Sequence, residues 1–517
     1  MRKWLVSLTV LALMAGAAVW AVQRHLDQGR ARDRAAAIDV GRRFVAAWNA
    51  GRFEVLGALT ADDPDAGTSF RLLATRLKAS SVRIAERSFN ADGTRMHLHV
   101  TAQLQGLGEL EWDNDLRMIK TRSRGARIAF TSATVFPRLA NGQVLTRSAP
   151  VLTRGELQDR TGKPIRTTSA DLAANVLGRA TSPQTGLERL YDAQLTGTSG
   201  GTVQVIDRAT GQVVRVVKVF PPKAPRPVRT TLDLRLQAAA EKALTKAHGR
   251  AALVVLDASS GQIRAVANQP VAGLPAAFRS EAPGSTFKVL VALAALQHGF
   301  KPTTRVNCPA TLIKGGKAFN NDEPLPATMT LQQAFALSCN TAFLNVADTF
   351  PKGTLRALAP SFGFDRGPLL TTRAEGGTVP PPAGTSEAYA DVIGQGRVEA
   401  SPLLMASVAA AVASGSWHRP HFDTAATETL PLPAAPLPAL RQMMAAVVTS
   451  GTARSAGLPP GTRGKTGTAQ YGTAAPLKSH AWFLGYRGDL AFCVYVENGD
   501  SGGHTAAPIA AAFLQTA

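Results

Sequence analysis

The segment Pro283-Gly284-Ser285-Thr286-Phe287-Lys288 is the most informative part of this sequence. The Pro-Gly pair interrupts regular structure, and the apolar run at 289–296 predicts a buried helix that begins near Ser285. Ser285 and Lys288 are three residues apart, so one face of that helix presents both the hydroxyl and the amine. A serine becomes a nucleophile when a base takes its proton, and a lysine can be that base if its pKa falls. Alone, this pair is a weak signal, because such pairs are common on solvated helices.

Two further motifs strengthen this interpretation. The second motif, Ser338-Cys339-Asn340, offers a hydroxyl that can relay a proton and an amide that can hold a substrate peptide bond. The third motif, Lys465-Thr466-Gly467-Thr468, combines a cation, two hydroxyls and a glycine before strand-like segments. Gly467 predicts room for a substrate backbone beside that strand. Ser-x-x-Lys, Ser-x-Asn and Lys-Thr-Gly in this order are typical of penicillin-binding proteins and related β-lactamases.

With these motifs, the chain resembles a class B penicillin-binding protein over residues 141–517. Further segments also read as family sequence: 186–192, 230–233, 255–257, 394–396 and 401–403. The cysteine inside the second motif departs from the usual pattern, and we interpret Cys339 as a small core residue. A bridge between Cys308 and Cys339 cannot be derived from the sequence.

The resemblance implies D,D-transpeptidation of peptidoglycan stem peptides ending in D-Ala-D-Ala, with β-lactams as covalent inhibitors and with no metal or other cofactor. Ser285 would be the nucleophile, Lys288 the base, Ser338 the proton shuttle and Asn340 the group that holds the peptide. The third motif would bind the substrate's terminal carboxylate through Lys465, Thr466 and Thr468, with Gly467 between them. Backbone N–H groups of Ser285 and Thr468 would form the oxyanion hole.

Two other functions remain open alongside transpeptidation. A β-lactamase would share the three motifs, but the Glu-x-x-x-Asn context of class A enzymes is absent, since no asparagine occurs between Asn345 and Asn498. An inactive scaffold of a wall-synthesis complex would not need the intact motif residues. The trypsin-like string Gly499-Asp500-Ser501-Gly502-Gly503 lacks an upstream histidine segment of the required kind, and we interpret it as a turn.

The N-terminal segment predicts a membrane anchor. Residues 1–3 would form a short cytoplasmic tail, and 4–22 is an uncharged stretch long enough to span a bilayer. The competing interpretation is a cleaved signal peptide, with Ala15-Gly16-Ala17 as the cleavage site. Arginines follow the stretch directly, so charge alone does not give the orientation. The family chemistry predicts a single-pass protein of the bacterial cell membrane with its catalytic domain outside the cytoplasm.

We predict a multidomain α+β protein beyond this anchor. Helical spacing followed by alternating runs predicts an α+β domain at 36–138, which weakly resembles a nuclear-transport-factor-2-like (NTF2-like) module. Residues 141–220 would form a pedestal-like linking domain, and 221–229 a proline-rich linker. Residues 230–517 would form a transpeptidase domain of the serine β-lactamase type, with an antiparallel sheet flanked by helices.

The charge balance and the cysteine content limit the kinds of partner and metal site that we expect. The chain has 57 Lys+Arg against 36 Asp+Glu, a net charge of +21, which attracts polyanions. No helix-turn-helix, zinc-finger or aromatic RNA-binding pattern accompanies this charge, so we expect no nucleic-acid partner. Three cysteines without a Cys-x-x-Cys cluster predict neither a disulfide-rich scaffold nor a zinc site. No glycosyltransferase domain is evident, so the resemblance implies a polytopic glycan-strand polymerase as partner.

Overall fold

The computed structural model describes residues 2–61, 66–122, 125–148, 152–182, 185–197, 200–270, 275–370, 374–423, 427–472 and 477–517, without the side chains of residues 2–13, 15 and 173. The chain forms two compact units. Unit 1 comprises Met1–Arg154 and Thr196–Arg226, and unit 2 comprises Gly155–Leu195 and Pro227–Ala517.

Unit 1 is built on a four-stranded antiparallel sheet in the order β1-β2-β3-β4. Side chains alternate along β2, so that Met96 and Leu98 are buried while His97 is exposed. Phe44 and Phe70, from the helices that cover the buried face, pack edge to face. The helix followed by strands agrees with the α+β class expected for 36–138. The elements of this part are α1 (Arg2–Asn49), η1 (Phe53–Val55), α2 (Leu56–Leu59), α3 (Ala66–Leu77), β1 (Ala79–Phe89), β2 (Arg95–Leu104), β3 (Gly108–Thr121), β4 (Gly125–Ile128) and α4 (Ser132–Val135).

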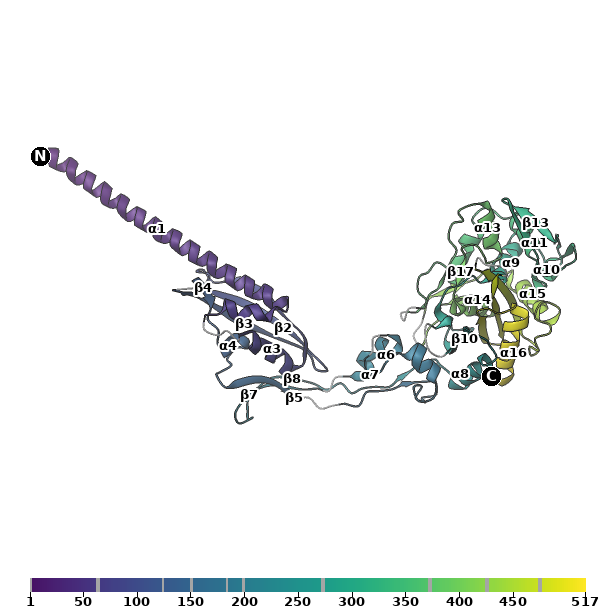
Figure 1. The fold of residues 1–517 in the computed structure, drawn as a ribbon, viewed down its shortest axis with the longest axis horizontal. Helices are drawn as coiled ribbons and strands as arrows, with labels where there is room; N and C mark the ends of the chain where they lie inside the picture. Colours follow the sequence, from purple (N-terminus) through teal and green to yellow (C-terminus); the bar gives the residue numbers. More distant parts are fainter. Residues whose placement is uncertain are drawn as a thin grey trace. The chain divides into compact units, whose positions relative to one another are not determined.

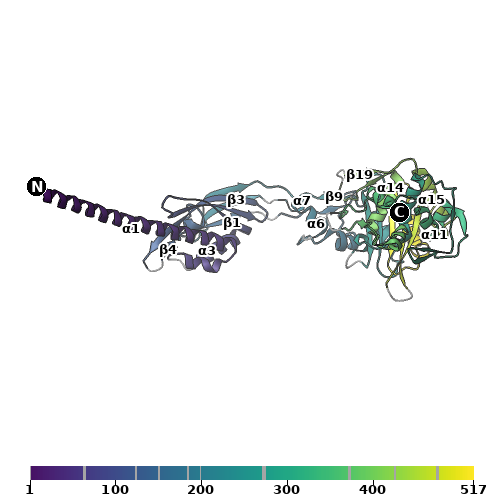
Figure 2. The same ribbon diagram turned by 90° about the horizontal axis from the view of Figure 1, so that it is seen from above.

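The N-terminal part of α1 extends beyond this sheet in both views (Figures 1 and 2). For most residues of the expected anchor, 4–22, the structure describes the helical backbone but not the side chains. Among the residues that are described, no helix combines the length and the apolar character needed to cross a membrane.

Residues 141–220, predicted as a linking domain, are divided between the two units. Strands β5 (Gln143–Ser148), β7 (Gly201–Asp207) and β8 (Val213–Phe220) make a three-stranded sheet of unit 1, because residues such as Val203 are buried in its core. Residues 155–195 join unit 2, because residues such as Leu187 are buried there. Their elements are β6 (Leu157–Gln158), α5 (Ala170–Leu172), η2 (Ala173–Leu177), α6 (Gly186–Leu190) and α7 (Asp192–Thr196).

Unit 2 contains a five-stranded antiparallel sheet in the order β11-β10-β22-β21-β20, which confirms the expected sheet. Strand β20 lies at one edge, and the third motif is part of it. The first elements of this region are β9 (Val228–Arg229), α8 (Leu234–Leu244), β10 (Ala251–Asp257), β11 (Ile263–Gln269), η3 (Ala276–Phe278), η4 (Gly284–Phe287), α9 (Lys288–Gln297), β12 (Arg305–Asn307), β13 (Thr311–Lys314), β14 (Lys317–Asn320), β15 (Thr328–Thr330), α10 (Leu331–Ala336) and α11 (Asn340–Ala347).

Helices pack against this sheet and around α9. Helices α8 and α16 contact each other and the sheet, and α14 packs against β10, β21 and β22. Helix α9 is buried from Lys288 to Ala295, because valine, leucine and alanine occupy all of its faces. The remaining elements are α12 (Thr354–Leu358), η5 (Ala359–Phe362), β16 (Gly377–Thr378), α13 (Thr385–Val392), β17 (Glu399–Ala400), α14 (Pro402–Ser414), β18 (Ser416–His418), β19 (Thr429–Pro431), α15 (Leu437–Thr449), β20 (Arg463–Tyr471), β21 (Lys478–Arg487), β22 (Leu490–Val496), η6 (Gly502–Ala506) and α16 (Ala507–Thr516).

Candidate active site

Ser285 lies in the nucleophile turn, which we define as residues 283–287, immediately before α9. Gly284 has φ +53°, and a Cβ there would come within 2.4 Å of the Thr468 carbonyl oxygen. The Gly284 N–H also donates to the Gly394 carbonyl at 2.8 Å. Only glycine fits this close backbone approach, which places Ser285 beside β20. Within the described part of the chain, the Ser285 hydroxyl has no hydrogen-bond partner.

Lys288 is fully buried, and its side chain is directed to the second motif. Its Nζ donates to the Asn340 Oδ1 at 2.6 Å and to the Ser338 carbonyl at 2.8 Å, and lies 3.4 Å from Ser338 Oγ. Burial lowers the pKa of Lys288 to about 7, and the negative charge of Asp322 opposes this effect. Near neutral pH a large fraction of Lys288 is therefore uncharged, as a general base requires.

Lys465 is the second buried lysine of the site. Its Nζ donates to Ser338 Oγ at 2.9 Å and to the Thr466 carbonyl at 2.9 Å. Burial holds the pKa of Lys465 well below its usual range, and the positive charge of Lys288 lowers it further. The Ser338 hydroxyl therefore lies between two amines that cannot both be protonated without a large cost.

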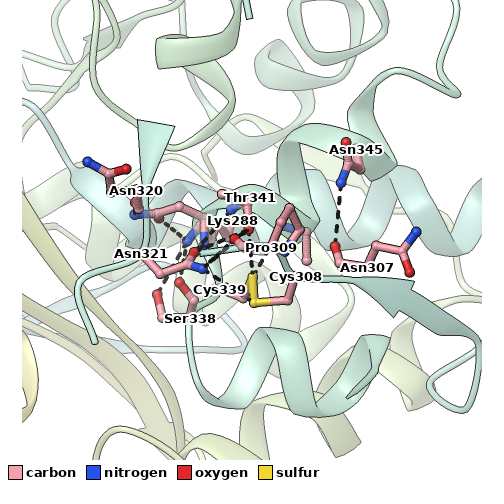
Figure 3. Close-up of a disulfide and its surroundings, with 12 residues drawn as sticks. Lys288, Asn307, Cys308, Pro309, Asn320, Asn321, Ser338, Cys339, Thr341 and Asn345 are labelled. Carbon is pink, nitrogen blue, oxygen red and sulfur yellow. Dashed lines mark hydrogen bonds between the residues drawn. A yellow bond between two sulfur atoms is a disulfide. The ribbon is translucent and has the colours of Figure 1, made fainter. Parts of the chain in front are cut away.

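The second motif is held by a covalent bond and by a polar network (Figure 3). Ser338 has a left-handed backbone with φ +61°, which is uncommon for a residue with a side chain. A disulfide joins Cys339 to Cys308. From the sequence we interpreted Cys339 as a small core residue and could not derive its pairing with Cys308. The structure shows a covalent bond at Cys339, the residue next to Ser338.

Both groups of the Asn340 amide are engaged inside the protein. Its Oδ1 accepts from Lys288, and its Nδ2 donates to the Asn320 carbonyl at 2.9 Å. Through its Oδ1 this amide holds Lys288 in place. Its role in holding a substrate peptide bond stays a prediction.

Gly467 packs closely against the nucleophile turn. A Cβ at this position would lie 2.8 Å from the Pro283 carbonyl oxygen and 2.8 Å from Thr286 Cγ2. The space in which a Cβ would lie is therefore filled by the nucleophile turn, and the predicted room for a substrate backbone stays a prediction. The glycine is needed because the turn packs directly against β20.

The two threonines of the third motif make contacts with the surrounding chain. Thr466 Oγ1 lies 2.6 Å from Thr452 Oγ1, and Thr468 Oγ1 accepts from the Gly502 N–H at 3.4 Å. Thr468 is half-buried in β20, the strand at one edge of the sheet.

The structure thus brings all three predicted motifs into one region. Sequence reasoning missed Asn320 and Asn321, which hydrogen-bond to Asn340, and Thr452, which contacts the third motif. The polar run that contains the two asparagines is the only sequence signal for them, and Thr452 has none. Within the described ranges, no group of three or more His, Cys, Asp or Glu residues is placed to hold a metal ion.

Residues 251–515 match the family described as the penicillin-binding protein transpeptidase domain. The chain is 30% identical to the peptidoglycan D,D-transpeptidase PbpA of Mycolicibacterium smegmatis over 398 residues, which cover 64% of this chain and 79% of the relative. Its counterpart in Mycobacterium tuberculosis is 29% identical over 401 residues, with the same coverage.

Solved structures show the same similarity. A ceftriaxone acyl-enzyme complex of penicillin-binding protein A from M. tuberculosis matches with a TM-score of 0.60 and 25% identity, over 71% of this chain and 98% of that one. The fold of apo penicillin-binding protein 3 from M. tuberculosis also matches, with a TM-score of 0.60 and 23% identity, over 71% of this chain and 96% of that one. The chain therefore belongs to the penicillin-binding protein transpeptidase family, as a class B penicillin-binding protein.

Proposed function

We propose that this protein is a D,D-transpeptidase that cross-links peptidoglycan stem peptides through an acyl-enzyme on Ser285, and that β-lactams inhibit it by acylating the same serine. The observation that carries the proposal is the meeting of two buried lysine amines at Ser338 Oγ, beside the nucleophile turn. The names of the relatives and the acyl-enzyme complex of the similar structure support it.

Acylation begins when neutral Lys288 takes the proton of Ser285. The Ser285 oxygen then attacks the carbonyl carbon of the penultimate D-alanine, and the N–H groups of Ser285 and Thr468 stabilise the resulting oxyanion. Each such donor typically contributes about 3 kcal/mol. The C–N bond then breaks, and Ser338 passes a proton from the lysine pair to the departing D-alanine amine. Asn340 keeps the Lys288 amine in position for both transfers.

The third motif binds the terminal carboxylate of the donor peptide through Lys465, Thr466 and Thr468. In the free protein, burial and the positive charge of Lys288 hold the pKa of Lys465 well below its usual range. A bound carboxylate favours the ammonium form, and the interaction is strong because water is excluded from the buried amine.

The N-terminal segment anchors the protein in the bacterial cell membrane through 4–22, with the catalytic unit outside the cytoplasm. The uncharged sequence of this stretch supports the anchor. The sheet and helices of unit 1 support an NTF2-like module at 36–138. A polytopic polymerase would supply the glycan strands that this enzyme cross-links.

Labelling of the purified full-length protein with a fluorescent penicillin tests the nucleophile. We expect a durable adduct on the wild type, none on Ser285→Ala, and an undiminished adduct on the matched control Ser259→Ala, which lies in an exposed turn. A transient wild-type adduct would instead indicate a β-lactamase, and no wild-type adduct would indicate a scaffold. Labelling of Ser285→Ala would show that another residue is the nucleophile.

A further inference from the structure

A buried histidine and a carboxylate that the proposed mechanism does not use lie beside the nucleophile turn. His480 belongs to β21 and is only 3% exposed. Its Nε2 lies 3.5 Å from Glu281 Oε2, and its Nδ1 lies 3.1 Å from the hydroxyl oxygen of Tyr495. The ring of Tyr471 stacks on the imidazole, with 4.0 Å between the ring centroids. The imidazole is therefore held by contacts with three different side chains.

The partners of the imidazole assign its tautomer. A carboxylate can only accept a hydrogen bond, so Nε2 carries the proton and directs it at Glu281. The other ring nitrogen, Nδ1, then accepts from the hydroxyl group of Tyr495. The contact with His480 lowers the pKa of Glu281, so this carboxyl is ionised near neutral pH. A neutral histidine thus satisfies a charged carboxylate on one side and a buried hydroxyl on the other.

The strand register places His480 on the face of the sheet that the nucleophile turn covers. His480 is paired with Ala469 of β20. Paired residues share a face of a sheet, and so do residues two positions apart on one strand. Gly467 is two residues before Ala469, and a Cβ at Gly467 would lie 2.8 Å from the Pro283 carbonyl oxygen. The imidazole and the nucleophile turn therefore lie side by side on the same face of β20 and β21.

Glu281 begins the segment that leads to Ser285, four residues later. The backbone of Glu281 exchanges two hydrogen bonds with Ala400, at 3.1 Å and 2.9 Å. Further along, the Gly284 N–H donates to the Gly394 carbonyl at 2.8 Å. These bonds fix the segment to the chain at 394–400. The side chain of Glu281 adds a direct connection from the segment to β21, through His480.

The oxyanion hole of the proposed mechanism depends on how the segment and the sheet fit together. One of its N–H donors, at Ser285, belongs to the nucleophile turn, whereas the other, at Thr468, belongs to β20. The distance between the two donors is therefore set by the position of the turn on the strand. A displacement of about 1 Å in such a site can lower the rate about 10²-fold.

We propose that His480, acting through Glu281, is a positioning residue that sets the nucleophile turn against β20 and thereby aligns Ser285 with the oxyanion donor of Thr468. This inference rests on the acyl-enzyme mechanism proposed above. His480 itself does not touch the substrate. Its contribution is to the geometry in which the covalent bond forms, so it affects the transition state more than the initial binding of the substrate.

Stopped-flow labelling of the full-length protein, over a range of fluorescent penicillin concentrations, tests this role. It separates the dissociation constant of the initial complex from the limiting rate constant of acylation. We expect His480→Ala to lower the limiting rate constant about 10- to 10²-fold and to leave the dissociation constant within about twofold of the wild type. His480→Gln can still direct an N–H at Glu281, so we expect it to recover most of the rate.

His421→Ala is the matched control in the same unit. The ring nitrogens of His421 contact the carbonyl oxygens of Asp423 and Ser260, and neither residue belongs to the segment before Ser285. We expect this variant to keep the limiting rate constant of the wild type, even where its free energy of unfolding is lower.

A double-mutant cycle tests whether His480 acts through its carboxylate partner. Glu281→Ala removes the same contact, so we expect it to slow acylation as much as His480→Ala, and the double variant to be no slower than either. Glu281→Gln keeps an oxygen that can accept the N–H and should retain most of the rate. The comparison of Glu281→Ala with Glu281→Gln also tests the proposal if His480→Ala does not fold.

The outcomes separate this proposal from the proposed function. If the wild type is labelled and His480→Ala, although less stable, is labelled at the same limiting rate, the pair is merely structural and the positioning role is refuted, while the acyl-enzyme mechanism stands. Rate losses that multiply in the double variant would also refute it, because the two residues would then act independently. If the wild type is not labelled, both proposals fail.

Discussion

The pH dependence of Ser285 acylation follows from the burial of Lys288. An exposed lysine with a pKa of 10.5 would be about 0.03% neutral at pH 7, whereas a pKa of about 7 makes about half of Lys288 neutral. Burial therefore increases the population of the free base by about 10³-fold. The difference between the two pKa values corresponds to about 5 kcal/mol of preference for the neutral amine.

We expect the second-order rate constant for penicillin acylation to fall about tenfold per pH unit below pH 7 and to level off above pH 8. Stopped-flow fluorescence with a labelled penicillin between pH 5.5 and 9 measures this profile. Lys288→Arg keeps a positive charge but cannot supply a neutral base, so we expect a loss of about 10²- to 10⁴-fold at every pH. Lys246→Arg, on an exposed surface, serves as the control.

Two outcomes would refute this reasoning. One is a profile that stays flat from pH 6 to pH 9, because acylation would then not depend on the protonation of a group with a pKa near 7. The other is a bend near pH 7 that survives in Lys288→Arg, because another group would then be titrating.

The low pKa of Lys288 also makes the stability of the folded protein depend on pH. The unfolded chain keeps the lysine proton up to about pH 10.5 and the native state releases it near pH 7, so this lysine makes the free energy of unfolding rise with pH between those values.

Three further changes have expected outcomes. Gly467→Ala places a Cβ 2.8 Å from a carbonyl oxygen of the nucleophile turn. We therefore expect the free energy of unfolding in denaturant to fall by about 1 to 3 kcal/mol and penicillin labelling to become slower. Unchanged values of both would contradict the close approach. Reduction of the bridge between Cys308 and Cys339, which are 31 residues apart, should lower the free energy of unfolding by about 4 kcal/mol, and an unchanged melting temperature in dithiothreitol would argue against the bridge. Asn321→Ala removes the acceptor for two backbone N–H groups at the start of α11 and should cost about 1 to 2 kcal/mol in thermal unfolding. The control Asn345→Ala, at a half-buried position whose amide makes only a 3.5 Å hydrogen bond, should change the free energy of unfolding by less than about 0.5 kcal/mol.

The local elements that carry the motifs could be predicted from the sequence. The apolar run after Lys288 is buried on all sides and forms α9. The two largely apolar segments 252–257 and 262–268, separated by the turn residues Ser260 and Gly261, form the antiparallel pair β10 and β11. These features follow from hydrophobic spacing and turn residues, which act over a few positions of the chain.

Features that depend on distant parts of the chain could not be predicted. Asn321 accepts hydrogen bonds from the backbone N–H groups of Asn340 and Thr341, which are 19 and 20 residues away in the sequence. No local sequence pattern indicates these contacts. The reason for Gly467 depends on which segment packs on its strand. Three cysteines allow three different pairs, so spacing could not select Cys308 and Cys339. The division of 141–220 between the two units depends on which core each apolar residue joins.

The redox state of Cys308 and Cys339 reports whether the chain has been exported from the cytoplasm. Cytoplasmic thiols are kept reduced, so Cys308 and Cys339 would remain free on a chain that was not exported and would be oxidised on an exported one. Cys493 is buried and unpaired in both cases, so a denatured exported chain would react with one equivalent of a thiol reagent and a retained chain with three. Counting alkylated thiols on the denatured chain therefore reports whether that chain was exported, without a fusion tag.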